Sequence, residues 1–378
     1  GDAATRKWQF LVAPSARRQI SGYALAAGAF IFLLLSVPYG IGYFASAMEN
    51  NEGLNYLNYP EGSLPDDQMA EILKVGTGHF ERAVDANPTF ITGYYKLASA
   101  YHSLSRLEPA QHKFWLGMSL KTYEKLARLA PDYSEIHYNY GIIYGDLADL
   151  ALSKAESATS NADRAAYMKQ AIDALEKAAA EHAEGAHQSN KLGTQVASAA
   201  ANESLADALD AYAQAEPEQA EKLKQQAHGL RLKSLAIYEK VLQYPPSRVD
   251  VSAPFPEGDP NFLHTRRSYA LLLEKLGRYK DAALQLHTLL LQTPGDDAAV
   301  RALSNVLDEM KDDRKAEAWL DEIIKSNPVR PEYRLIRMHL LQRQGRQAEA
   351  QQEAERIRRI QPEKEMQQAN KAKAQQAK

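Results

Sequence analysis

Three prolines spaced 34 residues apart constrain the fold of this chain more than any other feature of its sequence. They are Pro294, Pro328 and Pro362, and the residues between them repeat in type as well as in position. Proline cannot continue a helix, because it lacks a backbone N–H and its ring clashes with the preceding turn. The period therefore predicts a stack of similar helical units, each ended by proline.

Each unit has the pattern of two short amphipathic helices joined by a tight turn. The second helix begins its contact face with a small residue, and larger apolar residues follow at helical spacing. A small side chain lets the two helices approach closely, while the larger ones fill the seam between them. The turn residue and the small residue of three successive units are Gly277 and Ala282, Lys311 and Ala316, and Gly345 and Ala350.

This pattern resembles the tetratricopeptide repeat family in its period and in the types of its packing residues. Upstream, residues 137–144 and 94–101 match the first helix of such a repeat, and residues 76–88 match a lone second helix. The resemblance covers residues 66–362 and implies an all-α fold, an α-solenoid of TPR-like helix pairs. It is irregular at an insertion over residues 149–163 and in the Ala-rich segment 188–214, which has no clear repeat assignment.

An uncharged segment precedes the repeats and predicts a single N-terminal transmembrane helix. No charged residue lies between Gln19 and Met48, and about 20 apolar residues suffice to cross a hydrocarbon core. Basic residues precede this segment and acidic residues follow it, so the positive-inside rule places the N-terminus in the cytoplasm. We therefore expect a single-pass protein of the cytoplasmic (inner) membrane, with the TPR domain periplasmic or otherwise extracytoplasmic, and a lipid bilayer contacted through residues 20–45.

A cleaved signal peptide is the alternative interpretation of this segment. Ala45-Ser46-Ala47 has the small-x-small form of a signal peptidase site. The apolar run, however, is much longer than the 7–15 residues usual for a signal peptide, which favours a retained anchor.

These boundaries give the expected organisation of the chain. The expected parts are a short cytoplasmic N-terminus (1–19), the transmembrane helix (20–45), a linker (46–65), an N-terminal TPR-like block with insertions (66–244), a Pro-rich connector (245–260), a C-terminal TPR block (261–362) and a polar tail (363–378).

Composition excludes several classes of function. The 45 Lys and Arg against 48 Asp and Glu leave a net charge of −3, so nucleic acid is not an expected partner. The chain has no cysteine, which excludes disulfides, thiolate metal sites and a cysteine nucleophile. No phosphate-binding, dinucleotide-binding, zinc-hydrolase or serine-hydrolase motif is present. We therefore predict no catalytic residue, no cofactor and no metal, and a protein that is not an enzyme.

The resemblance instead implies a binding groove lined by the stacked first helices, which commonly receives a peptide or a partner helix. The predicted groove residues are Tyr95, Ser99, His102, Glu135, Tyr138, Asn139, Ile142, Arg267, Arg301 and Asn305, with His264, Asp308 and His339 at further groove positions. Of the two-carboxylate clamp known in the family, only Asn139 fits the pattern. Four other tyrosines occupy packing positions and are expected in the core, namely Tyr94, Tyr101, Tyr140 and Tyr144.

Two functions follow from this interpretation. The first is a membrane-anchored scaffold for protein–protein interactions, which docks or stabilises subunits of a larger membrane-associated complex. The second is a chaperone-like transport or assembly factor that transiently binds exported polypeptides. A stoichiometric subunit should copurify with one complex in fixed ratio, whereas a chaperone-like factor should crosslink weakly to many clients. An enzyme with an unrecognised active site is a third alternative.

Overall fold

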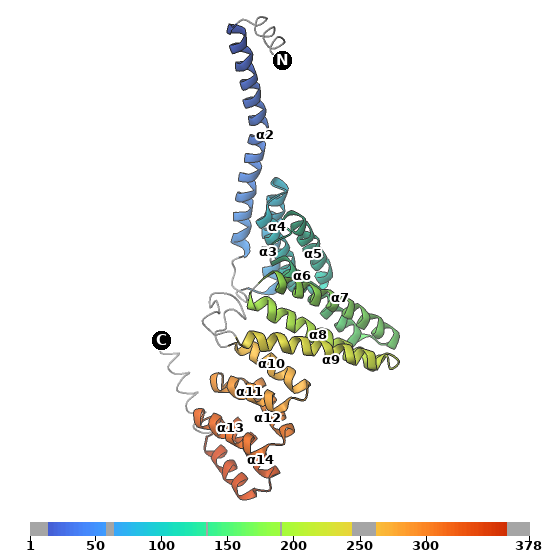
Figure 1. The fold of residues 1–378 in the computed structure, drawn as a ribbon, viewed down its shortest axis with the longest axis vertical. Coiled ribbons are helices and arrows are strands. Elements are labelled where there is room, and N and C mark those ends of the chain that lie inside the picture. Colours follow the sequence, from blue (N-terminus) through green and yellow to red (C-terminus); the bar gives the residue numbers. More distant parts are fainter. Residues whose placement is uncertain (1–13, 58–63, 134, 190, 244–261, 361–378) are drawn as a thin grey trace, which may run out of the picture. The chain divides into compact units, whose positions relative to one another are not determined.

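The computed structural model describes residues 14–57, 64–133, 135–189, 191–243 and 262–360, which contain helices and turns and no strand. The predicted all-α class is therefore confirmed for these residues (Figure 1). The labelled helices are α2 (Pro14–Leu57), α3 (Asp66–Ala86), α4 (Ile91–Leu107), η1 (Pro109–Gln111), α5 (His112–Leu129), α6 (Glu135–Ser157), α7 (Asn161–Gln188), α8 (Leu192–Ala215), α9 (Ala220–Leu242), α10 (Leu263–Lys275), α11 (Tyr279–Gln292), α12 (Asp297–Met310), α13 (Asp313–Ser326) and α14 (Pro331–Arg343). Residues 347–360 form a further helix.

The C-terminal helices start and stop where the 34-residue pattern places them. Asp296 and Asp312 cap α12 and α13, because their carboxylates accept hydrogen bonds from the backbone N–H groups of Ala299 and Lys315 at 3.1 and 3.4 Å. Each cap satisfies a backbone donor that the first helical turn leaves free.

A left-handed residue recurs in the turn inside each C-terminal unit. Gly277, Lys311 and Gly345 have φ angles of 71°, 54° and 75°. A residue in this conformation ends a helix and lets the chain reverse within a few residues. Gly277 and Gly345 adopt it without steric cost, whereas Lys311 is one of two described non-glycine residues with positive φ.

The predicted close-approach positions are fully packed. Ala282 and Ala316 are 0% exposed and Ala350 is 2% exposed. Leu286, Leu320 and other large apolar residues of the same helices fill the seam. This burial agrees with the register inferred from the 34-residue period.

The chain divides into two compact units, residues 1–136 and 137–378. In the first unit the last part of α2 packs along α3, and α4 packs on α5 (Figure 1). Residues 46–57 were expected in a linker, but they continue α2 without a break. The reason is packing: a Cβ added to Gly53 would lie 2.7 Å from the Phe80 ring, and one added to Gly76 would lie 2.8 Å from the Cβ of Tyr56. The end of α2 thus forms a helix pair with α3.

The second unit holds the remaining helices around two buried clusters. One cluster joins α6, α7, α8 and α9, and the other runs from α8 to α14. The Ala-rich segment 188–214, which had no repeat assignment, is mostly α8, and α8 packs closely on α9. Much of the expected insertion 149–163 is helical, since α6 continues to Ser157 and α7 begins at Asn161. The Pro-rich connector 245–260 and the polar tail 363–378 lie outside the described residues.

Candidate protein-interaction surface

In the first unit, the predicted groove residues of α4 are half-buried and held by their neighbours. The Tyr95 ring contacts the rings of Tyr123 and Tyr133, with centroids 6.2 and 5.7 Å away. The Ser99 hydroxyl lies 3.2 Å from the Tyr123 hydroxyl. The backbone carbonyl of His102 accepts a hydrogen bond from Ser105 at 2.6 Å. Tyr95 and Ser99 therefore contribute to packing between α4 and α5 as well as to the surface.

On α6, the predicted residues Glu135, Tyr138, Asn139 and Ile142 are also half-buried. The Tyr138 ring stands edge-on to the imidazole of His182 on α7, with centroids 5.6 Å apart. Tyr138 lies in the second unit and Tyr95 in the first. The two rings therefore belong to different units.

The His182 imidazole is buried at a close approach of α6 and α7. It is 7% exposed, and a Cβ added to Gly141 would lie 2.4 Å from its Nε2. Its Nδ1 has no hydrogen-bond partner among the described residues. Burial disfavours the charged form and lowers the pKa of His182 to about 4. This residue packs as a neutral ring. Its burial could not be predicted, because nothing local in the sequence distinguishes His182 from a surface histidine.

The clearest repeated surface lies on the first helices of the C-terminal units. Positions 34 residues apart form two rows, one of Arg267, Arg301 and Leu335 and one of Leu271, Asn305 and His339. We call these six residues the α10–α12–α14 face. Arg301, Asn305 and His339 are exposed, as are the apolar side chains of Leu271 (39%) and Leu335 (44%).

The residues of this face differ in whether they form ion pairs or hydrogen bonds with other parts of the fold. Arg267 forms an ion pair with Asp296, the capping residue of α12, and so ties α10 to the start of α12. Among the described residues, Arg301 and Asn305 have no hydrogen-bond or ion-pair partner. Asp308, a further predicted groove position, pairs with Arg343 at 2.8 Å. Arg301 and Asn305 are therefore the polar members best placed to meet a partner.

Leu271 and Leu335 were missed by the sequence reasoning, although the period itself identifies them. Leu335 occupies the position of Arg267 and Arg301, and Leu271 that of Asn305 and His339. Exposed leucines beside unpaired polar groups give this face the mixed apolar and polar character of a protein-binding surface. His264 lies one turn before Arg267 on α10 and is exposed.

The tyrosines expected in the core divide into two pairs. Tyr94 and Tyr101 are buried, at 7% and 3% exposure, as predicted. Tyr140 and Tyr144 are only half-buried and stack on each other with centroids 6.4 Å apart. Tyr140 and Tyr144 are thus less buried than predicted.

A tyrosine hydroxyl donating to a glutamate of the preceding helix recurs along the chain. The donor–acceptor distances are 2.5 Å for Tyr101 and Glu81, 2.6 Å for Tyr238 and Glu203, and 3.0 Å for Tyr269 and Glu239. Burial, reinforced by the carboxylate of Glu239, raises the pKa of Tyr269 to about 12. These tyrosines remain protonated at neutral pH and act as structural links.

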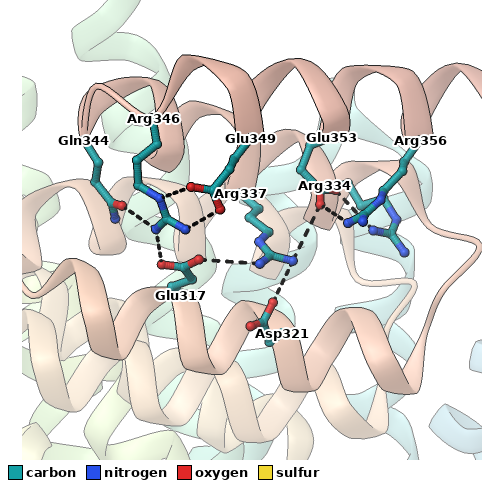
Figure 2. Close-up of polar contacts among 9 residues, drawn as sticks. All are labelled: Glu317, Asp321, Arg334, Arg337, Gln344, Arg346, Glu349, Glu353 and Arg356. Carbon is teal, nitrogen blue, oxygen red and sulfur yellow. Dashed lines mark hydrogen bonds and ion pairs between the residues drawn. The ribbon is translucent and has the colours of Figure 1, made fainter.

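A charged network joins the last three helices and was not foreseen (Figure 2). Its centre is Glu353, whose side chain is 3% exposed and lies 3.1 Å from Arg334, 3.6 Å from Arg337 and 2.6 Å from Arg356. Arg337 also reaches Asp321 on α13 at 2.8 Å. Three guanidinium groups thus compensate one buried carboxylate, which would otherwise be very costly to bury.

The network continues at Arg346, in the turn before the last helix. Arg346 forms a two-pronged pair with Glu349, at 2.6 and 2.5 Å, and reaches Glu317 of α13 at 2.7 Å (Figure 2). The pairing lowers the pKa of Glu349. All of these charges are paired, so the network serves to fix helices and leaves no group placed for proton transfer.

The described residues contain no group of three His, Asp or Glu side chains that could hold a metal ion. One described helix, from Tyr23 to Leu57, is long and apolar enough to cross a membrane, and a signal sequence would have the same properties.

Residues 273–338 match the family model of the tetratricopeptide repeat. The matched stretch runs from the end of α10 into α14 and contains three of the six residues of the α10–α12–α14 face, namely Arg301, Asn305 and Leu335. No curated protein matches the chain.

Several solved structures are similar to the chain at low sequence identity. One, described as the crystal structure of YrrB, a TPR protein with an unusual peptide-binding site, is 17% identical, with a TM-score of 0.36, over 67% of this chain and 95% of that one. A tetratricopeptide repeat protein from Parabacteroides merdae is 12% identical, with a TM-score of 0.38, over 84% and 93%. The assembly chaperone of RpL4 (Acl4) is 15% identical, with a TM-score of 0.35, over 80% and 98%. At these TM-scores the likenesses carry no argument about the site.

The chain is thus an α-helical solenoid, a fold class that serves as a scaffold for protein–protein interactions. More particularly, it carries tetratricopeptide repeats in residues 273–338, which confirms the predicted family for this stretch. The matched family is one of interaction repeats and not a catalytic family.

Proposed function

We propose that this protein is a membrane-anchored TPR scaffold that docks or stabilises subunits of a membrane-associated complex on the extracytoplasmic side. The observation that carries the proposal is the continuity of α2. Its apolar part is exposed, from Tyr23 at 75% to Phe44 at 67%, while its last part is packed into the first helix pair. A helix that exposes large apolar side chains on all sides needs a non-aqueous partner, and a bilayer provides one.

The same continuity favours a retained anchor over a cleaved signal peptide. Cleavage after Ala47 would remove Ser46 and Gly42, whose neighbourhood packs against the end of α3. Ser46 is 0% exposed and its hydroxyl donates to the Tyr43 carbonyl at 2.8 Å. A mature protein starting at residue 48 would therefore lose part of a formed helix interface.

Binding without catalysis is supported by the α10–α12–α14 face, where exposed leucines stand beside solvated polar groups. Tethering such a face to a membrane raises its local concentration near membrane partners. The ion pairs of the C-terminal repeats keep the face rigid, which lowers the entropy lost on binding. A chaperone-like factor for exported polypeptides is the competing function, and it would use the same face with weaker and more varied contacts.

Topology is tested with single cysteines, which are unique in this cysteine-free chain. In bacterial cells producing the full chain, a membrane-impermeant maleimide should label Ser103→Cys in the repeats and spare Ala3→Cys until the cells are lysed. Labelling of both positions in intact cells, or of Ala3→Cys alone, would contradict the proposed orientation.

The scaffold function is tested by gentle detergent extraction and mass spectrometry of copurifying proteins. One set of partners at fixed stoichiometry supports a complex subunit. Many partners at low and variable amounts, captured mainly by crosslinking, would support the chaperone-like factor instead.

A further inference from the structure

The C-terminal end of α3 lies beside a part of α2 that belongs to the uncharged segment. A Cβ added to Gly42 would lie 2.6 Å from the carbonyl oxygen of Ala86, the last residue of α3. Further along, Arg82 donates to the Glu49 carboxylate at 3.0 Å. The two helices are therefore antiparallel, and the turn after α3 points back along α2 towards its apolar part, as Figure 1 shows.

The depth of this turn follows from helix geometry. Arg18 and Glu49 are the first charged residues on either side of the uncharged segment. At 1.5 Å per residue they are about 45 Å apart along the helix, close to the 40–45 Å of a bilayer with its headgroups. Gly42 then lies about 10 Å inside the outer edge of the bilayer, which is slightly deeper than the ~5–7 Å of one headgroup layer and so near its boundary with the hydrocarbon core. Ala86, which touches Gly42, reaches the same depth.

The residues at this end of the first unit suit such a position. No charged residue occurs between Asp85 and Lys96, and Pro88, Thr89, Ile91 and Thr92 are exposed. An uncharged and exposed turn loses little on leaving water, provided that its polar groups are satisfied.

Three of its polar hydrogens are donated within the turn. The Asn87 side-chain oxygen accepts from the Thr89 N–H at 3.1 Å and from the Thr89 hydroxyl at 2.8 Å. The Phe90 N–H donates to the Asn87 carbonyl at 3.0 Å. In these three hydrogen bonds, donor and acceptor both belong to the turn, so water is not needed as a partner.

The last turn of α5 ends on the same side. Ser119 of α5 donates to the Ala98 carbonyl of α4 at 2.8 Å, and the two helices run antiparallel, so Leu129 lies near the start of α4. Leu129 is 39% exposed and Arg128 beside it is also exposed. Asp85 and Asp132 are exposed nearby, so this end carries no basic excess that would require anionic lipid.

We infer that the α3–α4 turn, residues 87–91, is a second membrane contact that lies near the boundary between the outer headgroup layer and the hydrocarbon core of the bilayer spanned by α2. The inference rests on the proposed function, because it requires α2 to span the membrane. Its consequence is that the first repeat is held to the bilayer at two places, through α2 and through this turn. Two contacts fix the tilt of the repeat against the membrane, which a flexible linker would leave free.

The test uses the full chain in liposomes, with an NBD fluorophore on one introduced cysteine at a time. The positions are Ile91→Cys in the turn, Ser103→Cys as the matched exposed position about 18 Å further along α4, and Phe32→Cys in the apolar part of α2. Nitroxides are placed either on the lipid headgroup or deep in the acyl chain. Zwitterionic liposomes are compared with liposomes that contain anionic lipid.

The expected result is quenching of position 91 by headgroup nitroxide at least twofold stronger than that of position 103, with equal strength in both kinds of liposome. Position 32 should be quenched mainly by the deep nitroxide. If position 32 is quenched and position 91 behaves like position 103, the turn is in water and the inference is wrong, while the anchor stands. If position 32 is not quenched by the deep nitroxide, α2 does not span and the proposed anchor fails together with the inference. If position 91 is quenched only in liposomes that contain anionic lipid, the contact is electrostatic and the inference of a neutral contact is wrong.

Discussion

The left-handed turn inside the C-terminal units is made by glycine twice and by lysine once. Lys311 adopts a φ of 54° between two repeats that use Gly277 and Gly345 at the same position. A side chain in this region brings its Cβ close to the carbonyl oxygen, at a cost of about 1–2 kcal/mol. The repeat requires the left-handed conformation at this position, because the second helix of the unit begins directly after the turn.

Replacing Lys311 with glycine should therefore raise stability. We expect a gain of about 1 kcal/mol, reduced somewhat by the greater freedom of glycine in the unfolded chain. Thermal unfolding should show a higher Tm for Lys311→Gly and a lower one for Gly277→Ala, which places a side chain in the same conformation without touching any neighbour. A lower Tm for Lys311→Gly would mean that the lysine side chain makes a contact worth more than the strain.

His182 shows how burial alone makes one residue sensitive to pH. Its folded pKa of about 4 lies below the ordinary value of 6.5, so the unfolded chain binds more protons between these two pH values. Stability is then fully present above pH 6.5 and is lost as the pH falls towards 4. Between pH 7.5 and 5.0 the loss should be about 2 kcal/mol, by linkage.

Unfolding in urea at these two pH values measures this contribution. The pH-dependent loss should shrink by about that amount in His182→Gln, which cannot titrate. His187→Gln removes an exposed histidine from the same helix and should leave the loss unchanged. If His182→Gln keeps the full pH dependence, other groups carry it.

At the scale of single helices, the sequence predicted most where the repeat is regular. The 34-residue period located the turns and the buried alanines of α11 and α13, because each short helix there packs through one small residue and a few large ones. The same reasoning did not assign α8, whose buried face is mostly alanine, glycine, serine and threonine and whose partner α9 is long. Small side chains pack in many registers, so the period leaves no trace in that part of the sequence.

Charged contacts were the least predictable feature of these helices. Glu353 lies 19 residues after Arg334, and Arg346 lies 29 residues after Glu317. Neither spacing is local, and most of the helices contain both Arg and Glu. Only the packing of three helices decides which of these pairs meet. The extension of α2 to Leu57 was missed for a similar reason. Glycine disfavours a helix, and only the packing of α3 against Gly53 explains why the helix continues through it.

The small residue at the helix crossing gives a direct test of the register. Ala316 is 0% exposed, whereas Ala318 on the same helix is exposed. Ala316→Leu should force α13 away from its partner at a cost of about 1–3 kcal/mol, and in a solenoid the neighbouring interfaces are weakened as well. Ala318→Leu makes the same substitution in solvent and should change the Tm little. Equal effects on thermal unfolding would show that the register is wrong.

At the scale of the whole molecule, the fold class and the repeat family were predictable, but the binding surface only in part. The period assigns Arg301 and Asn305 to a surface on the first helices, and both are exposed. The period predicts less about Tyr95, because a sequence does not show that the Tyr95 ring contacts the rings of Tyr123 and Tyr133. Truncating Tyr95 would therefore disturb packing and binding together, which makes it a poor probe of the groove.

The α10–α12–α14 face offers a cleaner probe. The double change Arg301→Ala with Leu335→Ala removes one exposed polar and one exposed apolar contact that the fold does not need. Residues at the centre of an interface often cost more than 1 kcal/mol when truncated, and leucine less often than arginine. We expect the affinity for a copurifying partner to fall at least tenfold, as measured by titration of the purified partner, while the Tm stays near that of the wild type.

The matched control is Arg314→Ala with Leu284→Ala, which removes the same residue types from exposed positions on the second helices α13 and α11. Because second helices stand apart from the first-helix rows, this variant should bind as the wild type does. Equal weakening by both variants would indicate a general effect on the repeats. Full binding by the Arg301 and Leu335 variant would move the interface to the first unit or to α2, and the C-terminal repeats would then act as a rigid extension of the scaffold.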